Sequence, residues 1–136
     1  MKPAILEIMS RDQTDGDLIN VFNTILPFEK HLPGMRYCGP GTNLTSRLYP
    51  DGTPRSGCEP VDRVDEAAMK HDIEYAIHKD RRHRLEADKV MINELLNINK
   101  PTLRERLERM VVIPIMYIKK FITACLLKIA IINNSN

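Results

Sequence analysis

The chain has no tryptophan, only three cysteines, and few aromatic residues, which make up 5% of its 136 positions. So few aromatic side chains argue against a β-sandwich and favour helices. The cysteines, Cys38, Cys58 and Cys125, are too few for a disulfide framework. A bridge between Cys38 and Cys58 and a set of three reduced thiols both fit this count. The sequence therefore predicts an all-α protein with few or no disulfides.

A strong charge imbalance is also missing, because the formal net charge is only +2. That total indicates neither a nucleic acid nor an anionic membrane as a partner. A local basic cluster fits a solvated turn, a contact with an anionic interface or a nucleic-acid patch: Lys79, Arg81, Arg82 and Arg84. No aromatic residues are interleaved with it, so we expect no nucleic acid. No basic and then apolar leader opens the chain, and we expect no secretion signal.

The length allows one compact domain, in which three parts are expected. Residues 1–30 form a lead-in, with a short amphipathic helix predicted at residues 16–26 and ended by Pro27. Residues 31–100 form the core. Within it, the density of proline and glycine from 33 to 60 predicts a structured loop region. Residues 101–136 form a C-terminal amphipathic helical segment.

Two helices are expected in the core, joined by a turn at residues 79–83. Asp62 or Asp65 is suited to cap the first, which runs through about His78, and the second runs from about Arg84 to Ile98. The first presents a stripe of Val64, Ala68, His71, Tyr75 and His78, and the second a stripe of Leu85, Asp88, Met91, Ile92 and Leu95. Because the turn is short, the helices should be antiparallel.

A capping box at Thr102 to Glu105 opens a third helical segment. Beyond it, a narrow apolar seam at residues 115–132 predicts a packing face, which is also suited to an oligomer interface: Ile115, Ile118, Ile122, Cys125, Ile129 and Ile132. A membrane-spanning helix is disfavoured, because lysines interrupt the seam at 119, 120 and 128 and Pro114 would kink the helix.

The stripes place chemistry between the two core helices. Asp88 lies among apolar residues, where an unpaired carboxylate would be costly to bury, and His71 lies at a similar height on the facing helix. A hydrogen bond between them would fix the imidazole tautomer and leave its other nitrogen free to act as a general base. Tyr75, one turn after His71, is placed to donate to Asp88. Asp72 points about 100° away from His71, which suits metal ligation.

A glycine-rich loop, Tyr37-Cys38-Gly39-Pro40-Gly41-Thr42, precedes these helices. Calcium prefers oxygen ligands, including backbone carbonyls, and glycines allow carbonyls to turn toward one point. A zinc site built from His71, His78 and cysteines is disfavoured, because no close pair has ligand spacing.

This loop, with Leu32-Pro33-Gly34 before it and Asn43-Leu44 after it, and the helix segment Asp65-Glu66-Ala67-Ala68-Met69-Lys70-His71-Asp72-Ile73-Glu74-Tyr75 resemble the phospholipase A2 domain of parvovirus minor capsid proteins. The resemblance covers roughly residues 31–96. That family combines a loop of Tyr-x-Gly-x-Gly type, a His-Asp-x-x-Tyr helix and a later helical aspartate. Secreted phospholipases A2 carry a cysteine just before the helix motif, whereas this chain has Ala68, as in the bridge-poor viral branch.

The resemblance implies a phospholipase A2-like fold and calcium-dependent hydrolysis of the sn-2 ester of glycerophospholipids. It implies His71 as base, Asp88 and Tyr75 as its partners, and Gly39 as an oxyanion donor. Calcium would be bound by Tyr37, Gly39 and Gly41 through their carbonyls and by Asp72 through its carboxylate. The expected setting is a virion or a host endosomal membrane, with peripheral contact to phospholipid. The alternative is a catalytically silent module that binds calcium or membranes.

Overall fold

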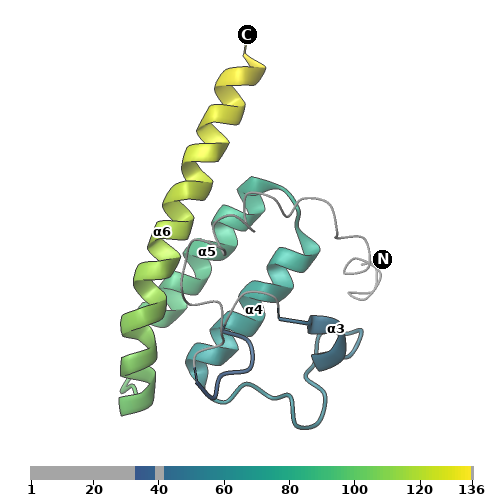
Figure 1. The fold of residues 1–136 in the computed structure, drawn as a ribbon, viewed down its shortest axis with the longest axis vertical. Coiled ribbons are helices and arrows are strands. Elements are labelled where there is room, and N and C mark those ends of the chain that lie inside the picture. The colour runs from purple at the N-terminus through teal and green to yellow at the C-terminus, as the bar shows by residue number, and fades with distance from the viewer. Residues whose placement is uncertain (1–32, 39–41, 136) are drawn as a thin grey trace.

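The computed structural model describes residues 33–38 and 42–135 (Figure 1). The lead-in, the helix predicted at 16–26, and two of the predicted ligands, Gly39 and Gly41, lie outside these residues. The described chain contains four helices and no strand: α3 (Leu44–Arg47), α4 (Arg63–Ile77), α5 (Arg81–Leu96) and α6 (Leu103–Asn134). The prediction of an all-α protein is confirmed. The three cysteines are all free, so the Cys38–Cys58 bridge is absent.

Helix α4 begins after Asp62, whose side chain accepts a hydrogen bond from the backbone N–H of Asp65 at 2.9 Å. Asp62 is therefore the cap, and Asp65 lies inside the first turn together with Glu66, where the helix dipole favours acidic groups. The predicted stripe is largely buried, since Val64, Ala68 and His71 are each at most 6% exposed.

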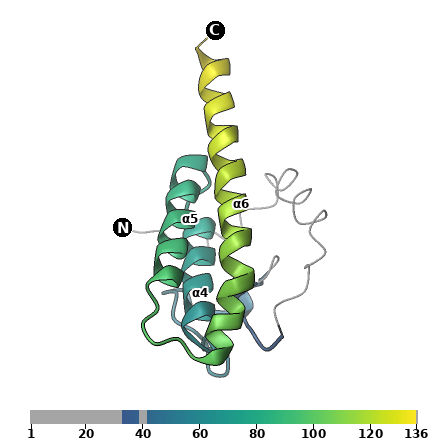
Figure 2. The ribbon, with the colours of Figure 1, turned by 90° about the vertical axis from the view of Figure 1, so that its left-hand side faces the viewer.

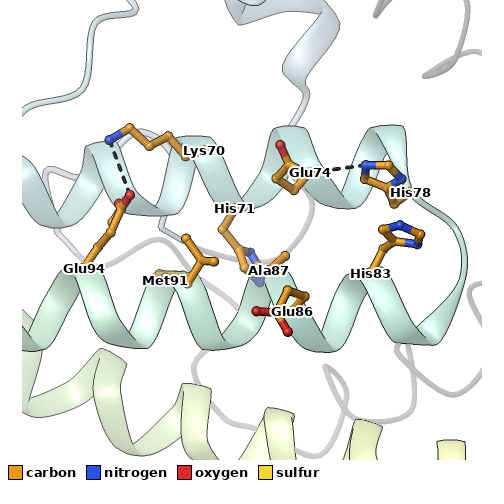
Figure 3. Close-up of a pocket in the computed structure, with 11 residues that line it drawn as sticks. Lys70, His71, Glu74, His78, His83, Glu86, Ala87, Met91 and Glu94 are labelled. Atoms are coloured by element: carbon orange, nitrogen blue, oxygen red, sulfur yellow. Dashed lines mark ion pairs between the residues drawn. The ribbon is translucent and has the colours of Figure 1, made fainter.

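Helix α5 begins at Arg81 and ends at Leu96, earlier at both ends than predicted. The predicted turn at 79–83 was too long because Asp80 caps the helix, its carboxylate accepting from the backbone N–H of His83 at 3.0 Å. At the other end, Asn97 takes the C-cap position. Helices α4 and α5 lie side by side and antiparallel, as expected (Figures 1 and 3).

Helix α6 starts with the predicted capping box, in which Thr102 and Glu105 satisfy each other's backbone N–H groups. It then continues as one helix through Pro114 to Asn134. Pro114 is tolerated because it is exposed on the outer side of the helix. Figures 1 and 2 show α6 running along α5 and projecting beyond its end.

The core lies where α4, α5 and α6 meet the loop region, and its fully buried side chains include Tyr37, Leu48, Val64 and Leu95. The loop is organised by α3 and by a single antiparallel bridge between Leu48 and Pro54. Helix α6 contributes Val112 and Met116 to this core.

The seam predicted at 115–132 does not pack within the described chain. Ile118, Ile122, Ile129 and Ile132 are 37% to 61% exposed, because the inward side of α6 is instead the one that carries Val112, Met116 and Lys119. By length and composition alone α6 could also cross a membrane. Its most apolar stretch of 18 residues has a mean hydropathy of 1.9, and 11% of that stretch is buried.

Candidate active site

His71 lies between α4 and α5 and faces α5 (Figure 3). Its Nε2 lies 2.7 Å from Oδ1 of Asp88, which is fully buried, and the Tyr75 hydroxyl donates to the same oxygen at 2.6 Å. The imidazole and phenol rings are 4.3 Å apart. The structure thus contains the contacts that the two stripes predict. Both partners share Oδ1 of Asp88, and its buried Oδ2 has no hydrogen-bond partner among the described residues.

The hydrogen bonding of Asp88 assigns the tautomer of His71. A carboxylate only accepts hydrogen bonds, so Nε2 carries the proton and donates it to Asp88. The other ring nitrogen, Nδ1, is then free to accept a proton. It lies 3.8 Å from Oδ1 of Asp72, so both groups face the same small space. This is the arrangement of an oriented general base.

Asp72 is partly buried, with 26% of its side chain exposed. Burial raises the pKa of its carboxyl group, and the nearby His71, Lys119 and Thr42 partly offset that effect. Its Oδ2 has no hydrogen-bond partner within residues 33–38 and 42–135. A buried carboxylate oxygen without a partner is costly, and a cation bound at that oxygen would remove the cost.

The loop that carries Tyr37 is linked to Asp72 of α4 through Thr42. The Thr42 hydroxyl donates to the carbonyl oxygen of Tyr37 at 3.4 Å and also contributes to the environment of Asp72. The Tyr37 carbonyl, a predicted ligand, and the Asp72 carboxylate are thus both linked to Thr42. The two remaining predicted ligands, Gly39 and Gly41, are outside the described residues, as is the oxyanion donor assigned to Gly39.

Asp65 anchors this loop, a role that the sequence did not reveal. Its side chain is fully buried and accepts from the backbone N–H groups of Tyr37 at 2.8 Å and of Arg36 and Val61 at 3.1 Å each. Each of these bonds is assisted by the negative charge. The signal in the sequence was present but ambiguous, because Asp62 and Asp65 were both suited to cap α4.

Lys119 is the second residue that sequence reasoning missed. It comes from α6, and its Nζ lies 4.0 Å from the centre of the Tyr75 ring. Burial lowers the pKa of Lys119, while Asp88 and Asp72 act to raise it. Arg84 of α5 also lies over the Tyr75 ring, at 5.1 Å. Only the packing of α6 brings this lysine to the site, so the sequence showed it merely as an interruption of the apolar seam.

A cleft of about 360 Å³ opens between α4 and α5, with His71 in its lining (Figure 3).

At the end near the helix turn, His78 and His83 stack with ring centres 4.3 Å apart, and with Asp80 they bring three candidate ligand atoms within 4.8 Å of one another. Among the described residues, this cluster does not include the His71 and cysteines of the zinc site considered from the sequence, although it shares His78 with it. Asp80 already has a structural task, because it caps α5 and its carboxylate contacts Nδ1 of His83 at 2.7 Å.

The packed helices α4, α5 and α6 hold a buried histidine between two carboxylates, and Thr42 links one of these carboxylates to a loop carbonyl. This is a small helical protein with an oriented histidine at its centre. Residues 28–112 match the family described as phospholipase A2-like domain, and the chain belongs to that family. The match begins before the loop and extends into the first third of α6. No curated protein and no solved structure gave a match.

Proposed function

We propose that this chain is a calcium-dependent phospholipase A2 that hydrolyses the sn-2 ester of glycerophospholipids with a water activated by His71. The observation that carries the proposal is the buried contact of 2.7 Å between Nε2 of His71 and Asp88, which leaves Nδ1 facing the site. Family membership supports the reaction class. We also propose that α4, α5 and the loop are arranged as in phospholipases A2.

His71 moves the proton in this reaction. Nδ1 takes a proton from water as the water oxygen attacks the sn-2 carbonyl carbon, and returns it to the glycerol oxygen when the ester bond breaks. The products are a fatty acid and a lysophospholipid. Asp88 stabilises the imidazolium formed in between, and Tyr75 keeps Asp88 in place.

The described residues fit calcium at the predicted position. The unpartnered Oδ2 of Asp72 and the carbonyl of Tyr37 are hard oxygen ligands of the kind that calcium takes, and Gly39 and Gly41 would supply two further carbonyls. When bound, calcium would supply positive charge to the ester carbonyl oxygen as negative charge develops there. Gly39 would add its backbone N–H to the same oxygen.

Lys119 favours one alternative, a catalytically silent module that binds calcium or membranes. A lysine beside Asp72 and Asp88 brings a cation into the region where calcium is expected. In this alternative the lysine offsets the buried carboxylates and no turnover follows. The retained contacts among His71, Asp88 and Tyr75 favour the enzyme, since a silent module would need no oriented base.

For the biological setting, we propose a peripheral contact with host phospholipid membranes, such as the endosomal membrane during viral entry. The basis is the resemblance to capsid phospholipase domains, and a place within a capsid protein is part of the same proposal. No nucleic-acid partner is expected.

The test is release of a labelled sn-2 fatty acid from phosphatidylcholine vesicles in calcium and in chelator. We expect calcium-dependent release that is abolished by His71→Ala and by Asp72→Ala. His78→Ala is the matched control, because it removes a histidine from the end of the same helix without touching Asp88. Calcium binding followed by calorimetry separates the alternatives: binding without hydrolysis supports the silent module. Undiminished release in chelator or in His71→Ala would sink the mechanism.

A further inference from the structure

We propose that the exposed side of α6 is a membrane-binding surface on which the helix lies flat against an anionic phospholipid bilayer. We call this surface the α6 outer face; its exposed apolar residues include Leu103, Leu107, Met110, Phe121, Ile129 and Ile132. The proposal deepens the proposed function and rests on it only for the expectation that the protein meets phospholipid.

The apolar character of this face is the first observation. Among the described residues, eleven of the fifteen exposed large hydrophobic side chains belong to α6. At about 100° per residue, all eleven fall within one half of the helix circumference, and they extend along roughly 45 Å. The buried residues of α6, such as Val112 and Met116, fall in the other half. Exposed apolar side chains gathered on one side of a helix over this length mark an interaction site.

The charges of α6 favour a lipid surface, and not a second copy of the chain, as the binding partner of the α6 outer face. Its two acids, Glu105 and Glu108, are buried and paired with Arg63 and Arg104. The exposed charges within the apolar half of the helix are therefore cations, Arg106 and Lys128. Two such faces packed together would bring like charges close, whereas anionic headgroups attract them.

The packing of α6 indicates a helix in the plane of the interface and not one that spans the bilayer. The inward half carries the buried acids and packs Val112 and Met116 against α4 and α5. A spanning helix would have to leave these contacts and take two acids into lipid, which is costly. A helix lying flat keeps every contact seen in the structure and buries only side chains that are already exposed.

The α6 outer face adjoins the loop that leads to the candidate calcium site. Pro33 shares a groove of about 700 Å³ with Leu103, Leu107 and Val111 of that face. At the next residue, a Cβ added to Gly34 would lie 3.0 Å from the Arg104 guanidinium. A bilayer on this face would therefore meet the chain three residues before Tyr37.

The test measures binding of the full chain, in chelator, to vesicles of two parts ether-linked phosphatidylcholine and one part ether-linked phosphatidylglycerol. These lipids have no sn-2 ester, so binding is scored without hydrolysis or calcium. We expect Phe121→Asp combined with Ile132→Asp to weaken binding roughly tenfold or more, because two apolar contacts are lost. The matched control combines Tyr49→Asp and Val90→Asp, which replace side chains 46% and 50% exposed elsewhere, and should bind like wild type.

A tryptophan probe keeps the test decisive if the double variant folds poorly. The chain has no tryptophan, so Phe121→Trp introduces a single reporter. We expect its emission to shift to the blue with vesicles and to be quenched by brominated lipid, and Val90→Trp to show neither change. An unquenched Phe121→Trp, or a blue shift that grows with protein concentration without vesicles, would overturn the proposal. A chain that binds vesicles but never hydrolyses ester lipid would refute only the proposed function.

Discussion

Removing the charge of Asp65 should detach the loop that carries Tyr37, which is proposed to bind calcium, from α4 while the helices remain. Asp65→Asn keeps one acceptor oxygen, which is able to serve the N–H groups of Tyr37 and Arg36 now facing Oδ1. The amide nitrogen would then face the N–H of Val61, now 3.1 Å from Oδ2, and two donors would meet.

The expected magnitude follows from these contacts. A buried N–H left without a partner costs about 1–3 kcal/mol, and a hydrogen bond that loses its charge assistance loses on the order of 1 kcal/mol. With one bond lost and two weakened, we expect the free energy of unfolding to fall by about 3–5 kcal/mol. If the loop detaches before global unfolding, the loss in stability is smaller and the loss appears in calcium affinity.

The assay is urea unfolding followed by far-UV circular dichroism, with calcium titration by calorimetry on the same samples. Glu66→Gln is the control. Glu66 is adjacent to Asp65, and its half-exposed side chain pairs with Lys70 at 3.3 Å. The substitution should therefore cost at most about 0.5 kcal/mol. If Asp65→Asn matches that control in stability and in calcium affinity, the anchoring role is refuted.

Three further predictions concern single carboxylates. Asp88→Asn should slow sn-2 hydrolysis more than it weakens calcium binding, because it acts on His71; equal losses in both assays would show that its role is misassigned. Glu105→Gln should lower the free energy of unfolding by about 2 kcal/mol at neutral pH, because it removes the pair with Arg63. An unchanged free energy of unfolding in urea titrations would show that this pair does not stabilise the fold. Glu108→Gln should remove the loss of stability expected as pH rises from 4.5 through about 7, because burial raises the pKa of Glu108 to about 7; an unchanged pH profile of urea midpoints would contradict it.

The sequence predicted the helical core and the central contact of the site because both follow local rules. Spacing of three and four residues placed His71 and Asp88 on facing stripes, and a short turn set their heights, so the contact needed no knowledge of distant packing. The boundaries of α5 were less accurate, because Asp80 was not recognised as the cap. The Thr102 capping box was recognised, since its pattern spans only four residues.

The residues that sequence reasoning missed depend on contacts across the chain. Asp65 is 28 residues from Tyr37, and no periodic pattern links them. Lys119 reaches Tyr75 only because α6 crosses the site with that side inward. The orientation of α6 also explains the error over the seam at 115–132. An apolar pattern shows which residues share a face of a helix. It does not show whether that face meets the core when the opposite face is also apolar.

The two acids of α6 give the contact between α6 and the rest of the core an unusual dependence on pH. Arg63 holds the pKa of Glu105 down at about 2, so the stability it contributes is full above 4.5 and is lost as pH falls toward 2. Burial near Asp62 has the opposite effect on Glu108, whose contribution is full below 4.5 and is lost as pH rises through about 7. The sum is greatest near pH 4.5–5. In mild acid Glu105 keeps its ion pair with Arg63 of α4, while Glu108 is neutral and does not repel Asp62. These two acids therefore hold α6 most firmly in mild acid, the condition of the endosome proposed as the setting.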